Sequence, residues 1–188
     1  MKSAAALVLA GAMLWALGTG SDARSTGPPR TEPIDLIVIH STGGPTCDDR
    51  TGKPIWVAAG TLDANLRYIE AHPVLGIHYM IDRDGTTRAS VPEGQIAHHV
   101  LRHSGRSIAV ELINDGNGVD PYPDAQLSAL VDLLRDIAQR RRLTRESVKR
   151  HSDLDQTMLP CDPASKRKVD PGAAFPYAMV LDRVFPAR

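Results

Sequence analysis

The feature that most constrains the fold is a short apolar run that ends at a histidine. Residues 36–39 are all large and apolar, and three of the four are β-branched. Such a run predicts a β-strand covered on both faces, as in parallel sheets flanked by helices. Sheets of this kind carry their functional sites beyond the carboxyl ends of the strands. His40, which follows directly, is therefore a candidate site residue, although a histidine can also simply terminate a strand.

Further strands and helices are expected to alternate along the chain. Apolar or alternating runs predict strands at residues 77–81, 86–91, 108–113 and 148–151. The first two form a hairpin around Asp82-Arg83-Asp84-Gly85, where glycine can adopt a positive φ. Apolar residues at helical spacing predict helices at residues 56–71, 124–141 and 175–185, with Pro73 stopping the first. The interleaved order predicts an α/β fold: one domain with a mixed central sheet flanked by helices.

The N-terminal residues are typical of an export signal. Lys2 supplies a positive charge, residues 4–17 are apolar and uncharged, and small residues up to Ala23 suit cleavage after that position. The apolar run is shorter than the roughly 18–20 residues that a membrane span needs, although an uncleaved anchor is an alternative. No cysteine follows the run, so a lipid anchor is not expected.

These features divide the chain into three parts. We expect a signal peptide at residues 1–23, a proline-containing linker or extended leading segment at 24–33, and a globular domain at 34–188. The protein is then exported, periplasmic or secreted, with no stable membrane insertion after cleavage. Lys plus Arg and Asp plus Glu both number 22, and this balance gives no indication of a nucleic-acid partner.

The two cysteines leave three interpretations open. Cys47 and Cys161 can form a disulfide in an oxidising compartment, remain free thiols, or supply a metal ligand through Cys161. Sequence alone does not say whether the two residues come within bridging distance.

Three residues besides His40 stand out as candidates for chemistry. His40 and His151 each end a predicted strand, and Asp170 lies in a segment shaped by the following proline and glycine. Strand alternation turns Glu111 away from its apolar neighbours. Two histidines and one carboxylate can hold zinc with one position open for water. Glu111 could then act as general base, and Lys168 could stabilise the oxyanion.

Six segments, in order, resemble the zinc-dependent N-acetylmuramoyl-L-alanine amidases of the type 2 amidase and peptidoglycan recognition protein superfamily. They are Ile37-Val38-Ile39-His40-Ser41-Thr42, Gly76-Ile77-His78-Tyr79-Met80-Ile81-Asp82-Arg83-Asp84-Gly85, Ala97-His98-His99, Ser107-Ile108-Ala109-Val110-Glu111-Leu112, His151-Ser152-Asp153 and Lys168-Val169-Asp170-Pro171-Gly172-Ala173-Ala174-Phe175. They cover most of the chain after the predicted signal.

The resemblance assigns roles to particular residues. It implies His40, His151 and Asp170 as ligands of one Zn²⁺ ion, with Glu111 as the catalytic carboxylate and Lys168 as the lysine two positions before the ligand aspartate.

Other positions refine these assignments. Ile77 stands where some relatives carry a catalytic tyrosine, which places the chain in the glutamate-using bacterial branch. His99 matches a histidine that lines the substrate cleft in relatives, His78 is expected to be packed, and Asp153 is expected to orient His151. The segment between His151 and Asp170 is longer than in relatives, some of which use a cysteine as third ligand.

The activity implied is hydrolysis of the amide bond between N-acetylmuramic acid and L-alanine in peptidoglycan or muropeptides. The alternatives are a non-catalytic peptidoglycan-binding module and a stem-peptide peptidase of the same fold. The sequence leaves the oligomeric state, the preference for intact or anhydro-muropeptides and the stem-peptide specificity open.

Overall fold

The computed structural model of the 188-residue chain describes residues 27–187, so the predicted signal peptide lies outside the described residues. The strands are β1 (Leu36–Ser41), β2 (Gly44–Cys47), β3 (Pro54–Val57), β4 (Tyr79–Ile81), β5 (Thr87–Ala89), β6 (Ser107–Leu112), β7 (Val148–Arg150), β8 (Met158–Leu159) and β9 (Asp162–Lys166). The helices are α1 (Leu62–Ala71), α2 (Asp124–Arg141), α3 (His151–Leu154) and α4 (Tyr177–Val184).

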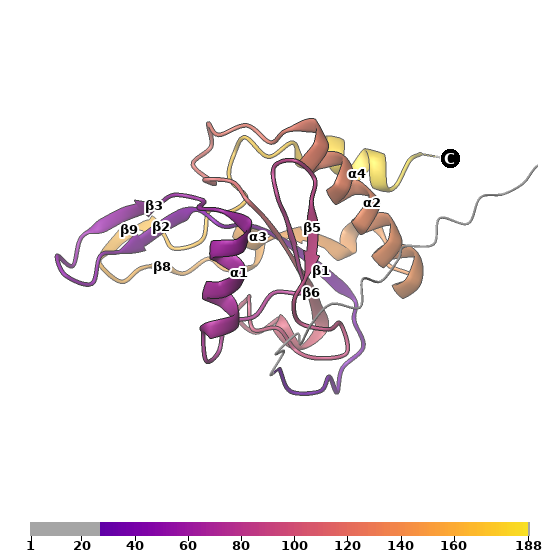
Figure 1. The fold of residues 1–188 in the computed structure, drawn as a ribbon, viewed down its shortest axis with the longest axis horizontal. Helices are drawn as coiled ribbons and strands as arrows, with labels where there is room; N and C mark the ends of the chain where they lie inside the picture. Colours follow the sequence, from indigo (N-terminus) through magenta and orange to yellow (C-terminus); the bar gives the residue numbers. More distant parts are fainter. Residues whose placement is uncertain (1–26, 188) are drawn as a thin grey trace, which may run out of the picture.

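The central sheet has five strands in the order β5-β4-β6-β1-β7 (Figure 1). The pairs β4–β6, β6–β1 and β1–β7 are parallel, and β5 pairs antiparallel with β4 at the edge. This confirms the predicted mixed sheet. All six residues of β1 are buried, which agrees with its continuous apolar run.

The two faces of the sheet are covered by different elements. Helices α2 and α4 pack on the face that carries Ile37, Ile39 and Val110. Helix α1 covers Met80 and Ala109 on the opposite face. Side chains alternate along a strand, so His40 and Glu111, in register with each other, belong to this second face.

The predicted start of the first helix was wrong. Helix α1 begins at Leu62, with the Thr61 side chain accepting a hydrogen bond from the Ala64 N–H at 3.3 Å. Trp56 belongs instead to β3, which pairs antiparallel with β2. Ile55, Trp56 and Val57 are residue types that favour strands, and Gly60, at φ +70°, separates them from the helix.

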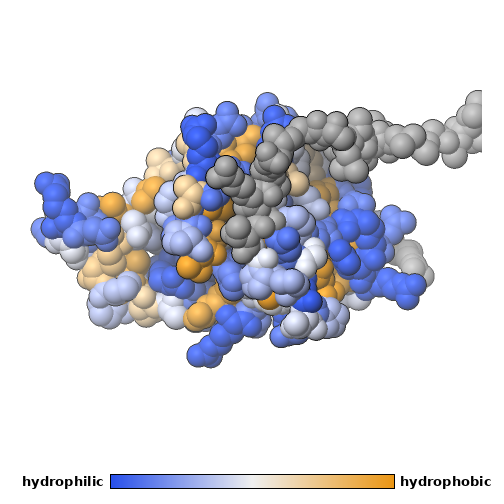
Figure 2. Space-filling model, turned by 60° about the horizontal axis from the view of Figure 1, so that its bottom comes forward, coloured by the Kyte–Doolittle hydropathy of each residue, from blue (hydrophilic) through white to orange (hydrophobic). Residues whose placement is uncertain are grey.

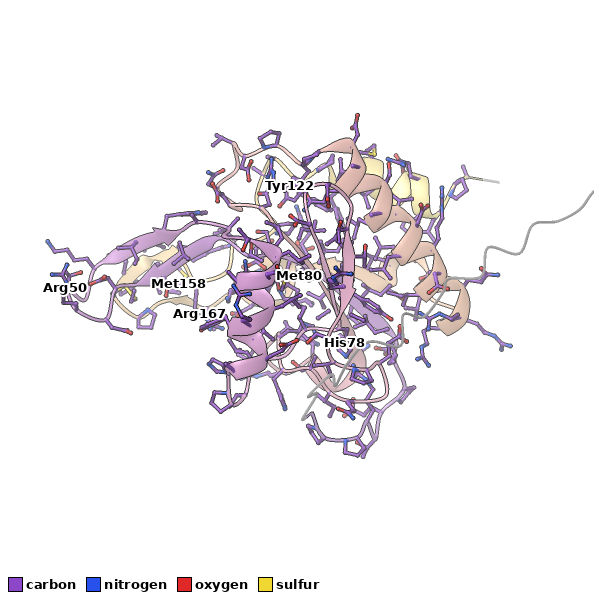
Figure 3. All side chains as sticks on the ribbon, in the orientation of Figure 1. Arg50, His78, Met80, Tyr122, Met158 and Arg167 are labelled. Atoms are coloured by element: carbon purple, nitrogen blue, oxygen red, sulfur yellow. A yellow bond between two sulfur atoms is a disulfide. The ribbon has the colours of Figure 1, made fainter. Side chains whose placement is uncertain are left out.

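Two hairpins project from the body as one arm (Figure 1). They are β2–β3 and β8–β9, the second in a segment that shows no regular pattern in the sequence. A disulfide between Cys47 and Cys161, with Cα atoms 5.9 Å apart, links them. Cys161 is therefore not available as a metal ligand. Arg50 lies at the far end of the arm (Figure 3), and apolar side chains including a half-exposed Trp56 are open on its surface (Figure 2).

Residues 27–33 run as an extended leading segment along the body. Pro29 forms an isolated antiparallel bridge with Gln95, and Arg30 donates hydrogen bonds to four backbone carbonyls. Within residues 27–187, no helix is both long and apolar enough to cross a membrane.

Candidate active site

The three predicted ligands meet at the carboxyl edge of the sheet. His40 lies near the end of β1, and His151 directly follows the neighbouring parallel strand β7. Asp170, in the loop before α4, completes the group. Its Oδ2 lies 3.2 Å from His40 Nδ1 and 3.0 Å from His151 Nδ1. All three residues are buried, and one candidate ligand atom from each lies within 4.8 Å of the others.

The charge state of this group suits a metal ion. Burial, followed by the neighbouring His151, lowers the pKa of His40 to about 4. Burial alone would raise the pKa of Asp170, but hydrogen bonds from His151 and His40 outweigh it and hold that pKa far below the usual range. At neutral pH the site therefore offers a neutral imidazole and a carboxylate, the forms in which these side chains bind metal.

Glu111 lies beside the group on β6. It pairs in register with His40 and is the only residue of β6 that is not fully buried. Burial, and then the charge of Asp170, raises the pKa of Glu111 to about 8, while the positive charge of Lys168 acts in the opposite direction. The positive charge of Lys168 also lowers the pKa of His40, so it influences both Glu111 and one of the candidate ligands.

His99 also reaches the site, on the side of His40 that faces away from Asp170. Its Nδ1 lies 2.9 Å from Nε2 of His40, and its Nε2 lies 2.9 Å from Oγ of Ser107. Both ring nitrogens of His99 thus contact protein groups, and His99 also lines the groove beside the ligands.

The surroundings of His151 differ from expectation. The Asp153 carboxylate accepts hydrogen bonds from Arg150 rather than from His151. Asp155 is the carboxylate near His151 Nε2, at 3.9 Å, which is too long for a hydrogen bond. Arg167 donates to Asp155 and helps to hold it. Asp155 lies four residues, about one helical turn, after His151. This spacing is the sequence signal that could have placed Asp155 beside His151.

Two other residues complete the surroundings. His78 is fully buried, as expected, and its Nδ1 accepts from the Ala109 N–H at 3.0 Å. Sequence reasoning missed Ser107, a small polar residue at the start of a buried strand.

A groove of roughly 480 Å³ lies beside the ligands. His99 and His151 line it together with Leu75, His98, Arg102 and Arg167. Because His151, one of the candidate ligands, lines this groove, a substrate lying in it would be next to the metal-binding group.

Comparisons with known proteins identify the family of the chain. The family Amidase_2, described as N-acetylmuramoyl-L-alanine amidase, matches residues 30–173. The 1,6-anhydro-N-acetylmuramyl-L-alanine amidase AmpD of Enterobacter cloacae is 32% identical over 164 residues, covering 80% of both chains. AmpD of Escherichia coli K12 is 33% identical over 165 residues, covering 80% of this chain and 82% of that protein.

Solved structures show the same fold. E. coli AmiD, in complex with anhydro-N-acetylmuramic acid-L-Ala-D-γ-Glu-L-Lys, superposes with a TM-score of 0.61 at 25% identity, over 84% of this chain and 59% of that one. Drosophila peptidoglycan recognition protein SD shares the fold at 18% identity and a TM-score of 0.57, over 83% of this chain and 84% of that one. The resemblance seen in the sequence is thereby confirmed, and the chain belongs to the N-acetylmuramoyl-L-alanine amidase family.

Proposed function

We propose that this protein is a zinc-dependent hydrolase of the glutamate-using branch that cleaves the amide bond between N-acetylmuramic acid and L-alanine in peptidoglycan or muropeptides. The observation that carries the proposal is the convergence of His40, His151 and Asp170 beside Glu111. The names of the AmpD relatives and the substrate in the AmiD complex support the choice of this bond as the one that is cleaved.

The ligand set fits one zinc ion. Two imidazoles and one carboxylate match catalytic zinc sites, which keep a position open. Zinc, when bound there, activates water and polarises the scissile carbonyl. In its carboxylate form, Glu111 would accept the proton of the attacking water and deliver it to the departing amine of L-alanine. Lys168 places positive charge near the oxygen on which negative charge develops. The products are a free lactyl carboxylate and a peptide that begins with L-alanine.

The experiment that tests the proposal is product analysis by mass spectrometry. Zinc-loaded protein is incubated with purified sacculi and with soluble anhydro-muropeptides, and chelator-treated protein serves as control. We expect peptides beginning with L-alanine together with peptide-free glycan. Fragments cut within the stem peptide would identify a peptidase. Binding to sacculi without any product would identify a non-catalytic module.

We also propose that the protein is exported to the periplasm or secreted. The signal-like residues 1–23 and the Cys47–Cys161 disulfide support this, because disulfides persist mainly in oxidising compartments. Cell fractionation with mass spectrometry of the intact protein tests the proposal. We expect a chain starting at Arg24 outside the cytoplasm, without free thiol. A cytoplasmic chain that retains residues 1–23 would contradict it.

A further inference from the structure

The carboxylate of Asp170 has few partners in the protein. Among the hydrogen bonds and ion pairs formed by residues 27–187, those of this carboxylate go only to His40 and His151. Both histidines are proposed ligands of the same ion, so neither can orient the carboxylate independently of that ion. Carboxylates that bind a metal are usually oriented by a further hydrogen bond from the protein. The position of the Asp170 side chain therefore depends on how its backbone is held.

The loop between β9 and α4 carries Asp170, and its backbone is held at two successive carbonyl groups. The carbonyl of Asp170 accepts from the Ser152 N–H at 3.0 Å, which ties this loop to the residue that follows His151. The next carbonyl, that of Pro171, accepts from the hydroxyl of Tyr122 at 2.6 Å. The first of these donors is a backbone group and the second is a side chain, so only the second can be removed by substitution.

Tyr122 is itself fixed in place. It lies in the loop between β6 and α2 and is buried in the main hydrophobic core. Its ring meets the ring of Phe175 edge to face, with centroids 5.1 Å apart. A hydroxyl on a ring that is packed in this way has little freedom, so it can hold a neighbouring loop without moving with it.

The same β6–α2 loop also supports the Asp170 loop through backbone contact. Gly172 has a φ of +83°, and a Cβ atom at this position would lie 2.5 Å from the carbonyl oxygen of Gly116. This close contact stops the Asp170 loop from moving further toward the β6–α2 loop. The Tyr122 hydroxyl keeps it from moving away.

We propose that Tyr122 is a positioning residue whose hydroxyl holds the Asp170 loop, so that the carboxylate stays within reach of both histidines. Oδ2 of Asp170 lies 3.2 Å from Nδ1 of His40 and 3.0 Å from Nδ1 of His151. The inference rests on the proposed zinc site. Without the hydroxyl, the Pro171 carbonyl loses its donor and the loop gains freedom. Zinc binding then has to order the loop, and this ordering lowers the affinity.

The test measures metal binding rather than turnover. Zinc affinity is determined by chelator competition for the wild type, Tyr122→Phe and Tyr177→Phe. The visible absorption spectrum of the Co²⁺-loaded proteins reports the geometry of the ligands. Tyr177→Phe is the matched control, because the Tyr177 hydroxyl also donates to a backbone carbonyl, that of Val148, at 2.7 Å, and its ring lies against the same core.

We expect Tyr122→Phe to bind zinc about 10-fold more weakly, at the lower end of the range for groups that orient a ligand, and to change the Co²⁺ spectrum. Tyr177→Phe should keep the wild-type zinc affinity and spectrum. Both variants lose one hydroxyl–carbonyl bond, so both should unfold at a lower temperature than the wild type in the metal-free state. A role in general stability alone would not separate the two variants in zinc affinity.

Two outcomes would overturn the inference. One is a folded Tyr122→Phe protein with the zinc affinity and Co²⁺ spectrum of the wild type. The other is an equal loss of zinc affinity in Tyr122→Phe and Tyr177→Phe. If Tyr122→Phe does not fold, Tyr122→Met, which removes the same hydroxyl, is judged by the same measurements. A wild-type protein that binds no zinc would instead overturn the proposed function, and this inference with it.

Discussion

His40 and Glu111 lie opposite each other, in register, on the neighbouring parallel strands β1 and β6. Neighbouring strands are about 4.7–4.9 Å apart, and side chains at paired positions point to the same face. The sheet ladder, rather than a loop, therefore sets the position of the proposed base relative to a proposed ligand. The proposed metal site and the scaffold around it lead to four predictions.

The first prediction concerns the third ligand. Asp170→Ala removes the carboxylate that both histidines face, so zinc affinity should fall by orders of magnitude. Cys161→Ser combined with Cys47→Ser should keep stoichiometric zinc, because those sulfurs are bonded to each other. Metal analysis of the purified variants shows whether Asp170 or Cys161 is the third zinc ligand. Zinc retained in Asp170→Ala and lost in the serine variant would reverse the assignment.

The second prediction is a pH dependence of stability that arises at Glu93. Glu93 accepts hydrogen bonds from Tyr79, Arg140 and Arg141. Burial alone would raise the pKa of Glu93, but these bonds outweigh it and lower the pKa from 4.5 to about 2. The folded-state pKa is depressed, so the stabilisation is complete above pH 4.5 and is lost as the pH falls toward 2.

Glu93→Gln should therefore lower the free energy of unfolding at pH 7 by about 1–3 kcal/mol. Asp136→Asn is the matched control, because Asp136 pairs with the same Arg140 on an exposed surface and should cost below about 1 kcal/mol. Urea unfolding at several pH values measures both. A difference between wild type and Glu93→Gln that does not shrink between pH 4.5 and 2 would contradict this interpretation.

Local patterns predicted the central elements well. Strand β1 and helix α2 were predicted because each has a strong apolar pattern of its own. The arm was not predicted, because its two hairpins are brought together by Cys47 and Cys161, which lie 114 positions apart in the sequence. Trp56 was placed in a helix because it was grouped with the apolar residues Leu62, Leu66 and Ile69, and the helix-start signal at Thr61 was overlooked.

The site was predicted unevenly for a related reason. The order of six motifs identified His40, His151 and Asp170, whereas their spacing alone did not. The side-chain partners of His99 and Asp155 depend on where ring nitrogens and carboxylates point after folding. Residue identity does not encode that direction.

The third prediction concerns the leading segment. Arg30 donates to the carbonyls of Glu93, Gly105 and Ser107 at 2.6, 2.7 and 2.6 Å, besides the longer bond to Ser104. Arg30→Ala leaves these acceptors without their charged donor, so the free energy of unfolding should fall by roughly 2–4 kcal/mol. Arg88→Ala, at an exposed arginine of β5, should stay within about 0.5 kcal/mol. Equal denaturation midpoints for both variants would show that the segment is a passive linker.

The last prediction tests the central claim, that Glu111 is the general base of a zinc amidase site. Glu111→Gln keeps the shape of the side chain but cannot take up a proton. The variant should fold, retain zinc, and hydrolyse a defined N-acetylmuramoyl-peptide with kcat lower by roughly 10²–10⁴-fold. KM should change little, because the lost interaction belongs to the transition state.

The deciding measurement is steady-state kcat on that substrate, with zinc content and thermal stability determined on the same sample. The account predicts the large loss of kcat in a zinc-replete, folded protein. Near-wild-type turnover in such a protein would contradict it.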